Sequence, residues 1–289
     1  MSALETSIDT LYQRHLALTK NLDWGYHRLL PWEIGKNFSD HPWQEHEGTL
    51  SKEMTIAVET AMLTEINLPW FTSTLMGAFS SAPRSLLRFV HTWTREEDQH
   101  GRVLDVYLLL SRNGNPDDRV ATQKTVIEAG WLSQYADPFA LMVYTSLQEL
   151  ATRVFYLSLA RAVADQDPTL ATILRTVAKD ETLHYTFYRD AVQLYLESDP
   201  GRLAVVCAVI PNFTMPGHGM PDFPRRMKII AEHAGYGISQ YYQQVLQVVL
   251  NTWGVLEYTS SKATSEPQQH LARYLRTVQK LAERSERDA

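Results

Sequence analysis

The chain has 289 residues, of which 44% are hydrophobic and 21% charged, and its formal net charge is −6. This composition is typical of a globular protein and excludes a disordered or fibrous chain. No apolar run approaches the length of a membrane-spanning helix, so we expect no membrane span, and the negative charge gives no reason to expect nucleic-acid binding.

Hydrophobic periodicity, interrupted by Pro, Gly and Asp, predicts an all-α chain. The expected helices lie, in chain order, at about 3–19, 50–79, 84–112, 118–132, 138–164, 168–197, 223–234, 238–253 and 266–286. Residues 21–49, which contain three tryptophans among Gly and Pro, predict a loop over the bundle. No linker is evident, so we expect a single domain, 1–289, with a four-helix core at about 50–197 and flanking helices at 198–286.

The four long helices form two pairs, joined by short turns at Ser80–Pro83 and Asp165–Pro168. Short connections make each pair an antiparallel hairpin. Asp137 and Asp167, each followed by proline, read as N-caps with a proline in the first helical turn.

Two Glu-x-x-His motifs lie on these helices, Glu97–His100 and Glu181–His184. The spacing places a carboxylate and an imidazole on one helix face, about one turn apart. Glu65 precedes Glu97 by 32 residues, and Glu149 precedes Glu181 by the same distance. Each residue of the second set, Glu149, Glu181 and His184, lies 84 residues after its counterpart in the first set, Glu65, Glu97 and His100. The pattern indicates an internal duplication of one site.

The residues beside the four glutamates on the same faces are mostly apolar or small, so we expect these carboxylates to face inward. Buried glutamates paired with Arg or Lys, or glutamates on an exposed face, are the alternatives, but no basic residue recurs at matching positions. One glutamate from each of two helices and Glu-x-x-His from each of two more is the di-iron or di-manganese arrangement of ferritin-like bundles. Oxygen donors with one imidazole per metal favour iron or manganese over zinc, and we expect two ferrous ions.

At these motifs the sequence resembles the soluble acyl-acyl carrier protein (acyl-ACP) desaturases. The motifs are Thr64–Pro69 (TEINLP), Glu96–Gly101 (EEDQHG), Tyr144–Thr152 (YTSLQELAT), Asp180–His184 (DETLH) and Thr214–His218 (TMPGH). The sequence departs from the plant pattern at Asp98–Gln99, at Thr182–Leu183 and in the short segment Gly219–Arg226. None of these departures removes a metal ligand, but the last puts substrate positioning in doubt.

The resemblance implies a ferritin-like fold and a role for each motif residue. It implies bridging ligands Glu97 and Glu181, terminal ligands Glu65 and Glu149, and one histidine per iron, His100 and His184. Thr152 resembles the active-site threonine, Asp180 a carboxylate behind a histidine ligand, and Trp24 the surface end of an electron path. Each has an alternative: a threonine bonded to its own helix backbone, a surface charge, and a residue that caps the core.

The activity implied by the resemblance is O2-dependent insertion of a cis double bond into a fatty acyl chain held on acyl carrier protein. Cys207 alone cannot hold an iron-sulfur cluster and no nucleotide-binding glycine motif occurs, so electrons must come from outside the chain, and the resemblance implies a ferredoxin as the donor. A homodimer is implied by the family alone. The N-terminus shows no leader pattern, which predicts a cytoplasmic protein.

Two other functions remain open from the residues: another di-iron oxygenase or oxidase, and ferritin-like iron binding without an organic substrate. The extra C-terminal helices and the N-terminal loop argue against the second. Gly77 and Ala78 are candidates to line an acyl tunnel, the alternative being that these small residues only allow close helix packing. Because acyl carrier protein is acidic, a basic docking patch is also expected, with candidates Arg84, Arg88, Arg225, Arg226 and Lys228.

Overall fold

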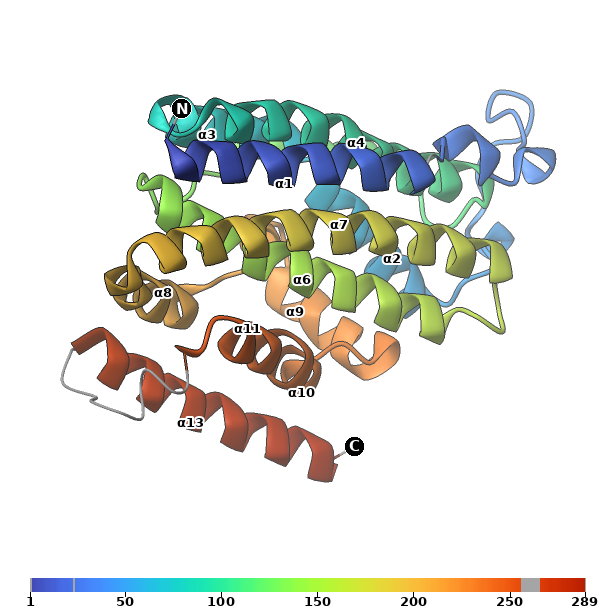
Figure 1. Ribbon diagram of the computed structural model, residues 1–289. Helices are drawn as coiled ribbons and strands as arrows, with labels where there is room; N and C mark the ends of the chain where they lie inside the picture. The colour runs from blue at the N-terminus through green and yellow to red at the C-terminus, as the bar shows by residue number, and fades with distance from the viewer. Residues whose placement is uncertain (1, 23, 256–265, 289) are drawn as a thin grey trace.

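The computed structural model describes residues 2–22, 24–255 and 266–288. Helices and turns make up this part of the chain, and it contains no strand. Its centre is a bundle of α2 (Lys52–Glu65) with α3 (Leu68–Ala78), α4 (Arg84–Leu110), α6 (Pro138–Ala162) and α7 (Pro168–Ser198) (Figure 1). The predicted all-α, ferritin-like class is confirmed, while Asp23 of the predicted loop and residues 256–265 of the flanking region lie outside the described residues.

The caps and turns of the bundle are those expected from the sequence. Asp137 accepts a hydrogen bond from the Ala140 backbone N–H at 2.8 Å, and Asp167 accepts one from the Leu170 N–H at 2.7 Å. Each aspartate thereby satisfies a backbone donor that the first turn of its helix leaves free. The two hairpins, α3 with α4 and α6 with α7, bring the Glu-x-x-His motifs of α4 and α7 into one bundle.

The expected single helix at 50–79 is wrong, because the chain breaks at Ile66 and Asn67 into α2 and α3. Pro69 accounts for the break: it has no N–H to donate to the Glu65 carbonyl, and its ring would clash with that carbonyl in a continuous helix. The N–H groups of Trp70 and Phe71 bond instead to the Asn67 carbonyl. Glu65 therefore occupies the last residue of α2, beside a turn.

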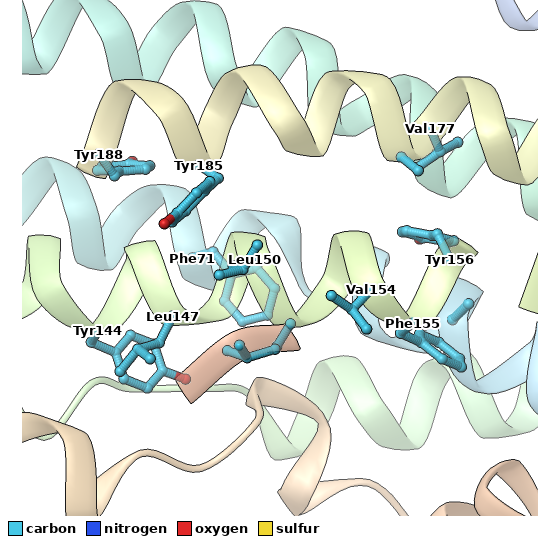
Figure 2. Close-up of a cluster of buried hydrophobic side chains, with 14 of the residues drawn as sticks. Phe71, Tyr144, Leu147, Leu150, Val154, Phe155, Tyr156, Val177, Tyr185 and Tyr188 are labelled. Carbon is cyan, nitrogen blue, oxygen red and sulfur yellow. The ribbon is translucent and has the colours of Figure 1, made fainter. Parts of the chain in front are cut away.

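Helix α6 is the most enclosed element, with buried residues on all its faces. Helix α1 (Ala3–Thr19) packs on α4 and α7, and the C-terminal helices cover the opposite side of the bundle (Figure 1). Figure 2 shows Tyr185 and Tyr188 of α7 beside the apolar side chains of α6, with Phe155 and Tyr156 further along the same helix. The core therefore surrounds the segment of α6 that contains Glu149.

The remaining helices, α5 (Pro116–Ala129) and the C-terminal layer, lie outside the bundle. The layer comprises α8 (Leu203–Val209), α9 (Phe223–Ile229), the π-helical turn η9 (Ile230–Ala234), α10 (Ile238–Tyr241), the π-helical turn η10 (Tyr242–Leu246), α11 (Gln247–Thr252) and α13 (Glu266–Asp288). The sequence did not predict α8, since its uniformly apolar stretch has no helical period. In the described residues, no helix has both the length and the apolar character needed to cross a membrane.

Candidate metal centre

Six buried side chains from four helices converge in the middle of the bundle. They are Glu65 of α2, Glu97 and His100 of α4, Glu149 of α6, and Glu181 and His184 of α7. None exposes more than 7% of its surface, so the expectation that the four glutamates face inward is confirmed. The turn after Glu65 and the two hairpins set the four helices in register.

The side chains form two overlapping groups, and in each group the candidate ligand atoms lie within 4.8 Å of one another. Position 1 consists of Glu65, Glu97, His100 and Glu181, and position 2 of Glu97, Glu149, Glu181 and His184. Glu97 and Glu181 belong to both. The structure thus brings all six sequence-predicted ligands together.

Several polar atoms at the centre lack partners, which is a test of whether the residues fit a metal. In the described part of the chain, Glu97 Oε1, both carboxylate oxygens of Glu181 and His184 Nδ1 are buried without a hydrogen bond. His184 Nδ1 and Glu97 Oε1 lie 2.8 Å apart but outside hydrogen-bonding geometry. Each such atom costs about 1–3 kcal/mol when left without a partner. Divalent cations would satisfy these atoms and balance the carboxylates, so the residues fit a pair of metal ions.

The hydrogen bonds separate the four glutamates into two kinds. The Tyr156 hydroxyl donates to Glu65 Oε1, and Trp93 Nε1 donates to Glu149 Oε1 at 3.1 Å. Glu97 and Glu181 lie in close contact with His100 and His184, and Glu181 also interacts with Glu149. A carboxylate that bridges two metals uses both oxygens, whereas a terminal one can spare an oxygen for a donor. Glu97 and Glu181 belong to both positions, and their bridging role stays a prediction.

The electrostatics show that the metal-free centre holds protons. Burial, followed by the neighbouring Glu97 and Glu181 charges, raises the pKa values of Glu65 and Glu149 well above their ordinary value. Burial lowers the pKa values of His100 and His184, but the surrounding carboxylates outweigh it and raise them well above the ordinary value. Metal ligands must be deprotonated, so a cation would have to displace these protons.

Behind His100 lies a hydrogen-bond chain that contains Asp180 and Trp24. His100 Nε2 donates to Asp180 Oδ2 at 3.2 Å, and Trp24 Nε1 donates to the same oxygen at 2.7 Å. The Trp24 and His100 rings are parallel, with centroids 6.1 Å apart. Trp24 also lines a polar surface pocket, so the structure places it between solvent and the centre.

A matching chain lies behind His184, and the sequence prediction missed it. His184 Nε2 donates to Glu96 Oε2 at 3.0 Å, and His15 Nε2 of α1 lies 3.0 Å from the same oxygen. The signal was available, because Glu96 directly precedes Glu97 as Asp180 precedes Glu181, again 84 residues apart. His15 had no such signal, since α1 lies outside the duplicated unit.

Thr152 faces an apolar pocket that reaches position 1. The pocket is narrow, with a cavity volume of about 20 Å³. Its lining residues come from α2, α6, α9 and the segments around η8 (Pro216–Gly219): Thr60, Ala61, Thr64, Glu65, Thr152, Phe155, Tyr156, Met215, Gly217, Phe223, Met227, Ile230 and Tyr236. In the described residues Thr152 makes no backbone hydrogen bond through its hydroxyl, unlike Thr145, which donates to the Leu141 carbonyl at 2.8 Å.

The structure also places the residues predicted to line the acyl tunnel and to form the basic docking patch. Gly77 is exposed, Ala78 is half-buried and neither lines the apolar pocket, so their predicted tunnel role is wrong. The break before α3 changes the helix register on which that prediction depended. Arg226 is largely buried and donates to Glu59 at 2.9 Å, which leaves Arg225 and Lys228 as the exposed basic residues of α9.

A helical bundle that gathers two Glu-x-x-His motifs and two further glutamates defines a ferritin-like protein with a candidate carboxylate-histidine metal centre. The whole chain, residues 1–289, matches the family described as fatty acid desaturase, and the protein belongs to that family.

Named proteins and a solved structure agree with this assignment. DesA1 of Mycobacterium tuberculosis, named as an acyl-ACP desaturase, is 27% identical over 272 residues, which cover 88% of this chain and 77% of the relative. Stearoyl-ACP 9-desaturase 3 of Arabidopsis thaliana is 27% identical over 313 aligned positions, covering 96% and 78%. The crystal structure of DesA2 from M. tuberculosis, designated an acyl-ACP desaturase, superposes with a TM-score of 0.70 at 20% identity and covers 93% of this chain and 99% of that one. The last likeness shows a common fold.

Proposed function

We propose that the protein is an acyl-ACP desaturase that uses two iron ions and O2 to convert a –CH2–CH2– pair of a carrier-bound fatty acyl chain into a cis double bond. The reaction consumes one O2, two electrons and two protons, and it releases two molecules of water. When bound, the two ferrous ions supply the chemistry that reduces O2 and oxidises the alkyl chain. The observation that best supports the proposal is the apolar pocket, which reaches Glu65 of position 1 and the Thr152 hydroxyl.

The chain's own residues then perform three tasks. Glu65, Glu97, Glu149, Glu181, His100 and His184 would hold the two metals. The pocket walls exclude water and fix one part of the acyl chain beside position 1, since position alone can select among unactivated methylene groups. Thr152 places a hydroxyl at this point of an otherwise largely apolar wall, where it can donate a proton or a hydrogen bond to oxygen species.

A surface groove extends the apolar pocket and supplies a route for the acyl chain. The groove and the pocket share Met215, Met227 and Tyr236, and Lys228 of α9 lies at the groove. We therefore expect the acidic carrier protein to dock over α9, near Arg225 and Lys228. Charge reversal at both residues should raise KM for acyl-ACP and weaken its salt dependence, whereas Lys280→Glu, an exposed change on α13, should do neither.

Electrons from an external donor would enter through Trp24, Asp180 and His100. The polar pocket at Trp24 also contains Lys20 and Arg95, which suit an acidic donor such as a ferredoxin. The ferredoxin and the homodimer stay predictions from the family resemblance.

The test of the function is a single-turnover reaction. Iron-loaded protein is reduced without oxygen in the presence of ferredoxin and stearoyl-ACP, O2 is admitted, and the released acid is analysed by mass spectrometry. A product lighter by two hydrogens is expected. A product that gains an oxygen atom instead would identify an oxygenase, and iron oxidation without any change in several acyl substrates would contradict the desaturase assignment.

A further inference from the structure

A second pocket reaches position 1 from between α2, α3, α4 and α5, and most of its polar lining belongs to α4. This α4 pocket has a cavity volume of about 350 Å³, against about 20 Å³ for the apolar pocket. The two pockets share only Glu65. They therefore approach the candidate metal centre from different sides of α2.

Carboxyl groups line the α4 pocket from its mouth to its inner end. At the inner end lie Glu65 and Glu97, which expose 7% and 5% of their surface. Nearer the solvent lie Asp98 and Asp105, whose side chains are 49% and 38% exposed. The pocket thus connects solvent with two of the candidate ligands of position 1.

Two arginines reduce the negative charge at the mouth of the pocket. Arg102 Nε lies 2.6 Å from Asp98 Oδ2, and Arg119 Nε lies 3.4 Å from Asp105 Oδ1. Arg102 is exposed and Arg119 is buried. The charge of Asp98 is therefore opposed by a side chain that can be changed without disturbing the core.

Gly101 separates the mouth from the inner end. It follows His100 directly and lies on the same face of α4 as Glu97 and Asp105, at four-residue spacing. A Cβ atom at position 101 would lie 3.4 Å from the Cβ atom of Glu65, which is ordinary van der Waals contact. A methyl group therefore fits, whereas a longer side chain would fill the pocket beside Glu65.

The other two openings near the centre suit a cation less well. The apolar pocket has room for about one water molecule, whereas a divalent ion usually retains several. The polar pocket at Trp24 contains Lys20 and Arg95, and it reaches Asp180 and Glu96 rather than a ligand. Of these three pockets, the α4 pocket alone combines space, carboxyl groups and contact with the candidate ligands.

From this arrangement we infer that the α4 pocket is the route by which divalent metal ions enter the buried centre. Asp98 and Asp105 attract the ion to the mouth, because a cleft lined by one sign of charge concentrates the opposite ion. Gly101 leaves the space through which the ion reaches Glu65 and Glu97. The inference rests on the proposed two-metal function and adds how the centre is loaded.

Stopped-flow mixing of metal-free, full-length protein with Co2+ tests the role of the mouth, read by the absorption of the bound ion. The rate constant is taken where the rate is proportional to Co2+ concentration. Asp98→Asn with Asp105→Asn should slow entry by about 10-fold and weaken its salt dependence. Arg102→Gln should accelerate entry. Asp117→Asn with Asp118→Asn, the same change of charge at exposed positions of α5, should do neither.

Gly101→Leu tests the passage itself. A blocked route slows entry and release by the same factor and leaves the equilibrium affinity unchanged, whereas a distorted metal centre changes the affinity. Release is measured by transfer of Co2+ to a chelator. Gly101→Ala should behave like the wild type, because its methyl group fits. If Gly101→Leu does not fold, as judged by circular dichroism, the charge variants decide.

Two results would overturn the inference: entry rates that ignore the charges at the mouth, or a Gly101→Leu protein with altered affinity and unaltered rates. A wild-type protein that bound no Co2+ would instead overturn the proposed two-metal function. The two failures are therefore distinguishable.

Discussion

The two metal positions are alike in their ligands and different in what surrounds them. Each position has one glutamate and one histidine of its own, and Glu97 and Glu181 belong to both positions. In each, the histidine also donates a hydrogen bond to a further carboxylate. Position 1 also reaches the apolar pocket through Glu65, and its histidine connects to Trp24 at a surface pocket. At position 2, Trp93 donates to Glu149 and His15 to Glu96, and Glu96 lines the same surface pocket as Trp24 and Asp180.

The duplicated helices therefore supply a symmetric set of metal ligands, and elements outside the duplicated helices make the surroundings asymmetric. Trp24 and His15 come from outside the duplicated unit, and so do the α9 residues of the pocket wall. We therefore expect the substrate to approach position 1, where the apolar pocket reaches Glu65, and electrons to enter through Trp24, Asp180 and His100.

Removing a shared ligand should have the largest effect. Glu97→Ala takes a ligand from both positions, so both metals should bind poorly, and product formation should fall by at least about 1,000-fold. Glu149→Ala should spare one metal but still abolish turnover, because the reaction needs two. Glu128→Gln, an exposed change on α5, is the matched control and should bind two metals per chain. Metal analysis and product assays on the same samples would contradict the comparison if Glu97→Ala kept both metals.

Metal removal should make stability depend on pH. The pKa values of Glu65, Glu149, His100 and His184 are raised in the folded metal-free protein, so the protons that these groups hold stabilise the fold. This stability is fully present below the unfolded pKa values and is lost as pH rises toward the folded ones. Between about pH 5 and pH 8 the melting temperature of metal-free protein should fall by several degrees.

Metal-loaded protein should lose much less stability over the same range, because the cations take the place of the protons. Calorimetric melting of both forms provides the measurement. A metal-free protein whose melting temperature rose with pH over this range would show that the six side chains do not form one coupled cluster.

Tyr156→Phe tests the contact special to position 1. Removing the hydroxyl leaves Glu65 Oε1 buried without its donor, so the fold or the metal at this position should be weakened by about 1–3 kcal/mol. Tyr188→Phe is the control, since the buried Tyr188 hydroxyl has no hydrogen-bond partner among the described residues. That change should be neutral or slightly stabilising. Urea unfolding and Co2+ titration of the two variants measure these effects. Equal effects of the two changes would show that the Tyr156 hydroxyl has no special role at position 1.

Trp24→Phe should have the smallest effect on the metals and a selective effect on electron supply. It removes the indole N–H bonded to Asp180, and turnover with ferredoxin should fall by roughly 10-fold while both metals remain bound. Trp32→Phe, at an indole that is 52% exposed, should leave turnover unchanged. Rapid-mixing measurements of iron oxidation state would reveal the step, and an unchanged reduction rate would exclude Trp24 as the electron path.

Much of the centre could be predicted because its ligands follow helical spacing. The 32-residue and 84-residue intervals place Glu65, Glu97, Glu149 and Glu181 level in two hairpins, and the structure brings them together. The same interval would have found Glu96 from Asp180. Local patterns of this kind survive folding because each side chain's position depends on its own helix and on one short turn.

Other features depend on contacts between distant segments and had no signal in the sequence. His15 reaches Glu96 only because α1 packs across α4 and α7. The position expected for Gly77 assumed one continuous helix from Glu65, but the chain breaks at Ile66 and Asn67 before Pro69. The basic side chain of Arg226 was expected at a docking surface, but it is largely buried and forms an ion pair with Glu59 of α2.

Anomalous X-ray diffraction from crystals of iron-loaded protein, collected on either side of the iron absorption edge, tests the central claim most directly. We predict two iron peaks between Glu97 and Glu181, one beside His100 and Glu65 and the other beside His184 and Glu149. A single peak, or iron located away from the two shared glutamates, would contradict it.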